Sequence, residues 1–315
     1  LATAPPRSWE ADPPRPGNLR VATFNIRNYP AEAGADAGAG GAAAATPANC
    51  LDETDEDMLL AVLGELDFDL LAVQEIRDPG RFEALLQRLG EEQGRGYASA
   101  WATNAASGNE QHVGLVAREG RLRLSDVREH PEVDVPGTLR AGLSAEVASL
   151  APGGVGFGVL VLHLASGDST KRAALRAQQA EIAAGIVAGL VAERGDEDFL
   201  VLGDLNTARA PEELAALDAA FATGTALGRQ ENQTGCTAYY VKNKLGELRA
   251  SAIDHVYAAS LQERDAAVPL VSGAHCYERS CQSFQSDGPQ TGTTYWGVSD
   301  HCPVYFEIRD ADLDG

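Results

Sequence analysis

The chain has 315 residues, and 44% of them are hydrophobic, which is enough apolar material for one large domain or two small ones. Its 25 basic and 46 acidic residues give a formal net charge of -21, which argues against a broad basic face for nucleic acid. A polyanionic substrate would then be met locally, by bound cations and a few arginines. No run of about 18 apolar residues occurs, so we expect no stable membrane insertion.

The two ends and one internal tract differ in composition from the rest. Residues 1–18 are rich in proline and predict an extended N-terminal arm. They lack a basic n-region and an apolar h-region, so they resemble a mature end left after signal removal, and we expect a secreted or periplasmic protein. The Ala/Gly tract at about 31–48 predicts a flexible insertion. We expect residues 19–309 to form a single domain, a monomer without a protein partner, and 310–315 to form a tail.

The predicted elements follow in chain order. A strand at Leu19–Ile26 precedes a helix that begins among the acidic residues Asp52–Asp57 and runs through Leu66, and a strand at Leu70–Val73 leads into Gln74 and Glu75. The other predicted elements are strands at Tyr97–Ala102, His112–Ala117, Leu139–Val147, Gly158–His163, Phe199–Leu202, Ile253–Tyr257 and Pro303–Ile308, a hairpin at Arg118–Arg121, a helix over Lys171–Glu193 and a helix starting near Pro211. This order favours an α/β sandwich of two mainly antiparallel or mixed sheets with helices outside.

The five cysteines are Cys50, Cys236, Cys276, Cys281 and Cys302. They lack the CxxC or Cys/His spacing of a zinc site. Cys276 and Cys281 close a short polar loop, which suits a disulfide in an oxidising compartment and leaves an odd thiol elsewhere. Cys302 is interpreted as a buried thiol.

Polar side chains occur within or directly after several apolar runs. The segments are Thr23–Arg27, Val73–Ile76, Leu162–Ser166, Gly203–Asn206, Ala252–His255 and Ser299–Pro303. Each has a structural explanation, such as a turn cap for Asn25, an ion pair with Arg77 or Arg81 for Glu75, and core hydrogen bonds for His163. A buried charge needs a partner or a metal, and the joint occurrence of these segments favours a shared site.

The chemistry of this set suits phosphoryl transfer. Oxygen atoms of Glu75, Asn25 and Asp300 would bind a hard cation, Mg²⁺ or Mn²⁺, with Ca²⁺ a further candidate. Asp204 and Asn206 either form an Asx-type turn or hold an attacking water.

The two histidines complete the predicted chemistry. His301 beside Asp254 would be a carboxylate-oriented imidazole, and His163 would donate a proton or a hydrogen bond to the phosphate. No covalent nucleophile is required.

The motifs TFNIR, QE, HL, GDLN, IDH and SDHCPV, in this order, resemble the endonuclease/exonuclease/phosphatase family, which includes DNase I, the exonuclease III group, neutral sphingomyelinases and inositol polyphosphate phosphatases. The resemblance covers Val21 to Ile308, and GDLN and SDHCPV are its specific part. It implies a four-layer α/β sandwich of the DNase I type with the active site at one edge of its sheets. It also implies metal ligands at Asn25, Glu75 and Asp300, a water- and phosphate-positioning pair at Asp204 and Asn206, and catalytic imidazoles at His163 and His301, with Asp254 supporting the second.

Further residues are assigned by position alone. Arg140 falls where DNase-like members place a phosphate-binding arginine, although a lone arginine on a strand is also a common salt-bridge partner. In DNase-like members a carboxylate just before the strand at Val113–Ala117 supports the first imidazole, and the resemblance implies this role toward His163 for Glu110 or Gln111. Asn109 and His112 would contact substrate or form a solvent-exposed strand end.

The substrate is less constrained than the reaction. The expected function is a DNase-like, bacterial-type secreted endonuclease that uses metal-assisted in-line water attack on DNA or another phosphodiester. The Trp-Cys-Asp-Arg sequence of inositol phosphatases is missing at Ile253–His255. A sphingomyelinase-like enzyme is the competing hypothesis, with Tyr239–Tyr240 and Tyr295–Trp296 as membrane contacts, although these aromatic pairs would equally stack on bases. A third hypothesis is a catalytically idle binding scaffold.

Overall fold

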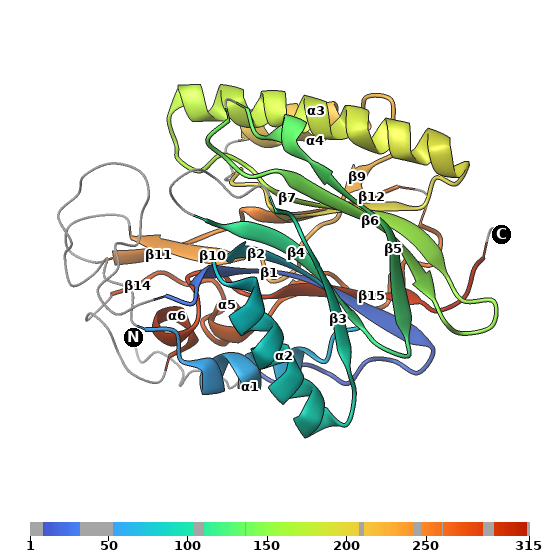
Figure 1. Ribbon diagram of the computed structural model, residues 1–315. Helices are drawn as coiled ribbons and strands as arrows, with labels where there is room; N and C mark the ends of the chain where they lie inside the picture. Colours follow the sequence, from blue (N-terminus) through green and yellow to red (C-terminus); the bar gives the residue numbers. More distant parts are fainter. Residues whose placement is uncertain are drawn as a thin grey trace.

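Two sheets packed face to face, with helices on their outer faces, form the molecule (Figure 1). The computed structural model describes residues 9–31, 53–103, 110–135, 137–207, 211–241, 247–259, 261–285 and 293–313. This arrangement confirms the predicted four-layer α/β sandwich. Apart from Ala31, the predicted insertion at 31–48 lies outside the described residues.

The first sheet has six strands in the order β13-β15-β1-β2-β4-β3. They are β13 (Val271–Ser272), β15 (Val304–Arg309), β1 (Asn18–Tyr29), β2 (Leu70–Ile76), β4 (His112–Arg118) and β3 (Tyr97–Trp101). Only the β1–β2 pair is parallel among these described strands. Nearly every residue of β1 and β2 is buried, as expected for strands covered on both faces.

The second sheet also has six strands, in the order β5-β6-β7-β8-β12-β9. They are β5 (Leu122–His130), β6 (Gly142–Ser149), β7 (Gly156–His163), β8 (Phe199–Asp204), β12 (Asp254–Ala259) and β9 (Gly228–Arg229). The neighbours β7 and β8 are parallel, so their carboxyl ends lie at the same edge. A small third sheet contains β10 (Ala238–Val241), β11 (Glu247–Ser251) and β14 (Phe284–Gln285).

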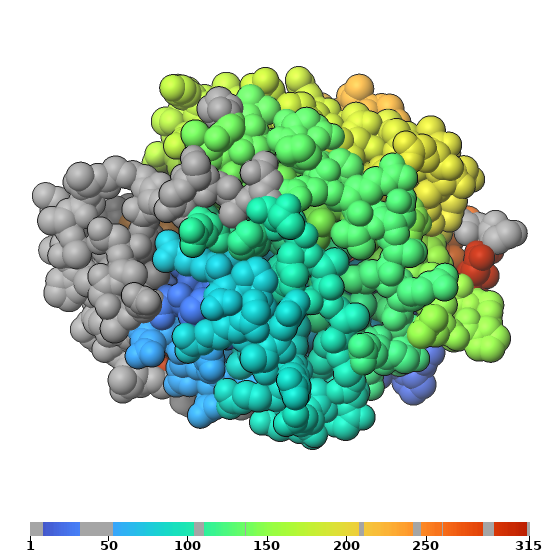
Figure 2. Space-filling model, viewed as in Figure 1, coloured from blue at the N-terminus to red at the C-terminus, as the bar shows by residue number. Residues whose placement is uncertain are grey.

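Helices cover both outer faces (Figure 1). In the space-filling view, the blue to cyan residues of the N-terminal part and the yellow-green to yellow residues near 170–200 lie on opposite sides of the molecule (Figure 2). The helices are α1 (Glu56–Leu66) and α2 (Pro79–Gln93) over the first sheet, α3 (Thr170–Arg194) and α4 (Pro211–Ala222) over the second, the short α5 (Ala274–Glu278) and α6 (Thr294–Gly297), and a 3-10 turn, η1 (Pro131–Val133). The side chains of Asp55, Asp78 and Ser169 accept backbone N–H groups at the starts of α1, α2 and α3. Within the described residues, no helix is long and apolar enough to cross a membrane.

The predicted hairpin at Arg118–Arg121 is wrong. The chain does turn there, but β4 pairs with β2 and β3 in the first sheet, and β5 pairs with β6 in the second. The turn is therefore a crossing between the two layers. A hairpin within one sheet and a turn between two sheets use the same turn residues, because the partner of each strand is determined by long-range packing.

The predicted disulfide between Cys276 and Cys281 is also wrong. Cys276 is bonded to Cys302, and Cys281 is bonded to Cys236. Cys276 lies on α5 with its side chain fully buried, and its N–H points to the Cys302 sulfur, so it faces the core and not the following loop. Cys302 is consequently no free thiol, and Cys50 lies outside the described residues.

Removing the Cys276–Cys302 bond by replacing both residues with alanine is expected to lower the free energy of unfolding by about 2–5 kcal/mol. The bond joins residues that are 26 apart in the sequence and connects α5 to the segment just before β15. Its loss raises the conformational entropy of the unfolded chain and removes a constraint on the segment beside His301. Thermal unfolding followed by circular dichroism measures the effect, with dithiothreitol added to the intact protein as a parallel test. An unchanged Tm in both experiments would contradict the assignment.

Candidate active site

The ends of three neighbouring strands bring the polar motifs of the second sheet together. His163 at the end of β7 is paired with Asp204 at the end of β8. Asp204 is in turn paired with Asp254 at the start of β12. Because paired residues on adjacent strands lie side by side, the HL, GDLN and IDH motifs meet at one edge of this sheet.

The Asp204 carboxylate lies at the centre of this cluster. Its Oδ2 atom accepts a hydrogen bond from Asn25 Nδ2 at 3.0 Å. The Nε2 atoms of His163 and His301 lie 3.4 and 3.7 Å from the same oxygen. Burial raises the pKa of Asp204 to about 7. A carboxyl group with a pKa near neutrality is suited to accept a proton from water.

The GDLN segment holds Asp204 through a special backbone. Gly203 has φ +141°, and a Cβ placed there would collide with the Leu162 carbonyl oxygen, so only glycine lets β7 and β8 approach this closely. Asn206 has φ +49°, its N–H donates to Asp204 Oδ1 at 2.9 Å, and its Nδ2 donates to Leu164 O at 3.2 Å. The segment therefore is an Asx-type turn and also fixes the carboxylate.

His301 is oriented by Asp254. Its Nδ1 lies 2.9 and 3.1 Å from the two Asp254 carboxylate oxygens. Burial alone would lower the pKa of His301, but the negative charges of Asp254 and Asp204 outweigh it and raise this pKa well above its usual value. His301 is therefore an imidazolium at neutral pH: Nδ1 donates to Asp254, and the Nε2 N–H is available as a second donor.

His163 has the opposite character. Burial, and then the positive charges of Arg140 and His301, lower its pKa well below the usual value, so it is neutral. Its Nε2 faces the carboxylates, and its Nδ1 has no hydrogen-bond partner among the described residues.

The predicted support of the first imidazole is not formed. The Gln111 amide donates to Asn28 Oδ1 at 2.7 Å, and no hydrogen bond within the described part of the chain joins Gln111 or Glu110 to His163. Glu110 lies shortly before β4 at φ +47° and is exposed, whereas the His163 ring is buried.

The first sheet supplies Asn25 and Glu75. The pairing of β2 with β4 shifts between Val73 and Ile76, where β2 has one residue more than its partner, and Glu75 lies in this bulge with φ +63°. Glu75 Oε2 accepts the Asn28 N–H at 3.0 Å, and Oε1 lies 3.2 Å from Asn25 Nδ2. Positive φ in a residue other than glycine is strained and is common at functional sites. The bulge thus aims Glu75 across the interface between the sheets.

The amide of Asn25 joins the two sheets. Its nitrogen donates to Glu75 and Asp204, and its oxygen accepts the Arg27 N–H at 3.1 Å. The amide therefore orients both carboxylates. A metal-ligand role would use the second lone pair of the oxygen, and this role of Asn25 stays a prediction.

Asp300 lies beside Arg27. Its Oδ1 is 3.8 Å from Arg27 Nε and has no hydrogen-bond partner among the residues described. Arg27 is buried, donates to the Trp296 carbonyl at 3.2 Å and lies over the Tyr295 ring. An acceptor left unpaired at a buried position is suited to bind a cation or water.

Arg140 is buried next to the cluster. One guanidinium nitrogen donates to Leu164 O at 3.1 Å, Nε has no partner, and no ion pair involves this side chain within the described ranges. Burial lowers the pKa of Arg140, while the charges of Glu75 and Asp204 act in the other direction. The salt-bridge interpretation therefore loses support, and an anion-binding role remains.

Other expectations have mixed outcomes. His112 uses Nδ1 to contact Ala102 O at 2.7 Å, and Asn109 lies outside the described residues. Arg81 pairs with Glu56 and not with Glu75. Tyr295 and Trp296 are buried, so they are not membrane contacts.

Two residues of the site were not predicted. Ser299 Oγ donates to Asn25 O at 2.8 Å and accepts the His301 N–H at 3.1 Å, so it ties β1 to the SDHCPV segment. Thr237 Oγ1 accepts the Asp254 N–H at 3.0 Å. Ser299 stands inside a recognised motif and could have been found, but no sequence pattern marks Thr237.

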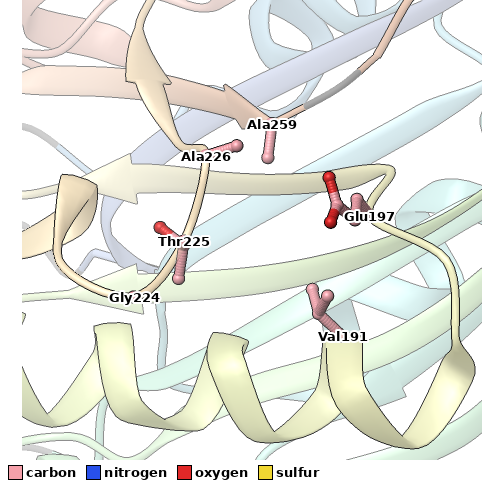
Figure 3. Close-up of a pocket in the computed structure, with 6 residues that line it drawn as sticks. All are labelled: Val191, Glu197, Gly224, Thr225, Ala226 and Ala259. Atoms are coloured by element: carbon pink, nitrogen blue, oxygen red, sulfur yellow. The ribbon is translucent and has the colours of Figure 1, made fainter.

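A separate hollow of about 320 Å³ lies between α3 and the end of β12 (Figure 3). It is lined by Val191, Glu197, Gly224, Thr225, Ala226 and Ala259. Ala259 ends the strand that Asp254 begins, so this hollow is at the opposite end of the sheet from the cluster.

The comparisons with known proteins agree with the fold. No curated protein matches the chain in sequence. Human Nocturnin has a catalytic domain with a TM-score of 0.57 and 16% identity, covering 94% of this chain and 95% of that chain. TDP2 of D. rerio, complexed with a single strand DNA product, has a TM-score of 0.56 and 14% identity, covering 93% of this chain and 99% of that chain. A Bacteroides thetaiotaomicron mannosyl-6-phosphatase has a TM-score of 0.56 and 16% identity, covering 92% of this chain and 99% of that chain. These identities show the fold alone.

The family is shown by sequence. The sequence model of the endonuclease/exonuclease/phosphatase family matches residues 22–301, which contain every predicted metal ligand and catalytic residue. The match confirms the resemblance carried by GDLN and SDHCPV, and the chain belongs to this family of phosphoester hydrolases.

Proposed function

We propose that the chain is a divalent-metal-dependent phosphodiester hydrolase, and that DNA is the substrate. The observation that carries the proposal is the position of Asp204 Oδ2, within 3.0–3.7 Å of nitrogen atoms of Asn25, His163 and His301. A carboxylate that is held by the Asn25 amide and the Asn206 N–H, with two imidazoles beside it, is positioned to hold and deprotonate a water. The DNA product in the TDP2 relative favours a nucleic-acid substrate.

The donor set fits a hard cation. Glu75, His163 and Asp204 each offer a ligand atom, and these atoms lie within 4.8 Å of one another. From this group we propose Glu75 as a ligand of Mg²⁺ or Mn²⁺, because those ions prefer carboxylate oxygens. Asp300, which has an unpaired carboxylate oxygen, is proposed as a further ligand. When bound, the ion neutralises negative charge on the phosphate.

The protein groups divide the remaining work. Asp204, fixed by Asn206 and Asn25, accepts a proton from the attacking water. Neutral His163 donates a hydrogen bond to a phosphate oxygen, and the His301 imidazolium donates another, with Asp254 holding its ring. Arg140 adds a fixed positive charge. The bond from phosphorus to the leaving oxygen breaks on the side opposite to the water, and the leaving oxygen takes up a proton from solvent.

Purified protein would be incubated with Mg²⁺ or Mn²⁺ and with plasmid DNA, sphingomyelin vesicles and inositol phosphates in parallel. We expect DNA cleavage that EDTA abolishes and that His163→Ala and Asp204→Ala each reduce strongly. Asp126→Asn, on the exposed face of β5, is the matched control. If only the sphingomyelin vesicles are cleaved, the protein is a lipid phosphodiesterase and not a nuclease. If no substrate is cleaved with any metal, the result supports the hypothesis of a catalytically idle scaffold.

Asp254→Asn should shift the alkaline limb of the pH profile of kcat/KM toward lower pH. The carboxylate raises the pKa of His301, so removing its charge lowers that pKa and the imidazolium is lost at a lower pH. The asparagine oxygen can still accept from Nδ1, which keeps the ring in place. We also expect kcat to fall by about 10²- to 10⁴-fold. An unchanged alkaline limb would show that His301 does not act as the cation.

The two disulfides support an extracellular or periplasmic location, where such bonds persist.

A further inference from the structure

The small sheet places one face of β10 beside the active site. Ala238 pairs with His301 in an antiparallel bridge, and the Tyr239 N–H donates to Asp300 O at 2.9 Å. Directly paired residues in antiparallel strands project to the same side of a sheet, and so do residues two apart on one strand. Tyr240 therefore projects to the side that carries the His301 ring, about 7 Å along the strand from Ala238.

The two faces of this sheet differ sharply. Tyr239, on the opposite face, is 1% exposed and packs with Phe284 in the cluster around the disulfides. Tyr240 is 50% exposed. The other large apolar or aromatic residues that are this exposed in the described part of the chain are Val127, Leu150, Tyr277 and Leu313, none of them on β10 or β11.

An arginine accompanies the exposed ring. Arg249 on β11 is the direct partner of Tyr240, so both side chains lie on one face. The Arg249 side chain is 41% exposed, and its Nε contacts Glu247 at 3.2 Å. An exposed ion pair of this kind is weak, and a guanidinium has further N–H donors for an anion.

We propose that Tyr240 and Arg249 form a nucleotide-binding surface, in which Tyr240 stacks on an unpaired base next to the scissile phosphate and Arg249 contacts the following phosphate. A base that stacks on a side chain must leave its own helix, so single-stranded or locally unpaired nucleic acid is the preferred substrate. This inference rests on the proposed phosphodiesterase function and names the substrate of the same site.

The chemistry of the face favours a base over a lipid. Membrane contact needs a contiguous apolar surface, whereas the face around Tyr240 carries Arg249, Glu247 and Ser251. An exposed ring with a cation beside it is the pattern of single-strand binding, because every base offers a π face and every linkage a negative charge. The net charge of -21 makes such local recognition necessary.

The test compares thymidylyl-(3′→5′)-thymidine with two analogues, each lacking one base. For the wild type, we expect kcat/KM to be about 5- to 100-fold lower with one of the two analogues than with the full dinucleotide. Tyr240→Ala should lower the rate on the full dinucleotide by a similar factor and abolish the discrimination, while Tyr240→Phe retains it. Tyr277→Ala changes another exposed tyrosine, on α5 (43% against 50% for Tyr240); it is the matched control and should behave as wild type. Arg249→Gln should slow a trinucleotide more than the dinucleotide.

Binding separates this inference from the proposed function. Calorimetry with thymidine 5′-monophosphate and deoxyribose 5-phosphate measures the contribution of the base without hydrolysis. Suppose that no diester is cleaved, but thymidine 5′-monophosphate binds more tightly than deoxyribose 5-phosphate and Tyr240→Ala removes the difference. The hydrolase proposal is then wrong and the binding surface is supported. If diesters are cleaved but neither rate nor affinity depends on the base or on Tyr240, the binding surface is overturned and the hydrolase stands. Tyr240-dependent cleavage of sphingomyelin vesicles, without discrimination between the dinucleotides, would also overturn it.

Discussion

Replacing Asp204 with asparagine is expected to lower kcat for phosphodiester cleavage by about 10²- to 10⁴-fold. The amide keeps the size of the side chain and removes the oxygen charge that faces Asn25, His163 and His301. Steady-state cleavage at saturating Mg²⁺ measures the loss. The control Asp126→Asn changes an exposed carboxylate of β5 and should leave the rate unchanged.

The same substitution should affect stability in the opposite direction. A carboxyl group whose pKa is near 7 in the folded chain, and near 4 when unfolded, binds its proton more tightly in the folded state. The free energy of unfolding of the metal-free protein therefore decreases as the pH rises from about 4 to about 7. Asp204→Asn should raise the Tm at pH 8 in EDTA and change it little at pH 4. Lower stability at pH 8 would mean that Asp204 is needed to hold the fold.

Glu75→Gln is expected to weaken Mn²⁺ binding and to reduce cleavage by about 100-fold at limiting metal, with partial recovery as the metal concentration rises. Glutamine retains an acceptor for the Asn28 N–H but loses the charge that attracts the cation. Isothermal titration with Mn²⁺ and cleavage as a function of metal concentration measure the two effects. Glu83→Gln, which alters an exposed contact to Trp101 on the outer side, is the control. Unchanged Mn²⁺ affinity would exclude Glu75 as a ligand.

The strand ends of the site were predictable because apolar runs precede them. Phe199–Leu202 is short and apolar, and the glycine and acidic residues after it mark where the strand leaves the sheet. Family motifs then assigned chemistry to Asp204 and His301. Periodicity alone would not have paired β7 with β8, because strand neighbours are chosen by tertiary packing.

Other features gave weaker signals. The strands β10 and β14 have four and two residues, too few for a visible alternation. The edge strand β5 is polar, which hides it from hydrophobic pattern. The α2 helix, with a capping Asp78 and buried Phe82 and Leu85, carries a clear helical spacing that was overlooked.

Cysteine pairing and bulge geometry are features that the sequence alone does not determine. Spacing in sequence does not determine disulfide connectivity, because the partner of each cysteine depends on the folded path. The bulge that contains Glu75 is likewise a property of the β2–β4 pair and not of either strand alone. Both were accessible only from the folded chain.

The hydrogen bond from Asn25 to Asp204 has a consequence for thermal inactivation. Asn25 belongs to one sheet and Asp204 to the other, and the apolar layer between the sheets fixes their separation. A loop can fray without breaking this contact, whereas sliding of the sheets by about 1 Å would exceed the range of a hydrogen bond. Catalytic activity on heating should therefore disappear in the same sharp transition as the near-ultraviolet signal of the interior, without an earlier phase of partial inactivation.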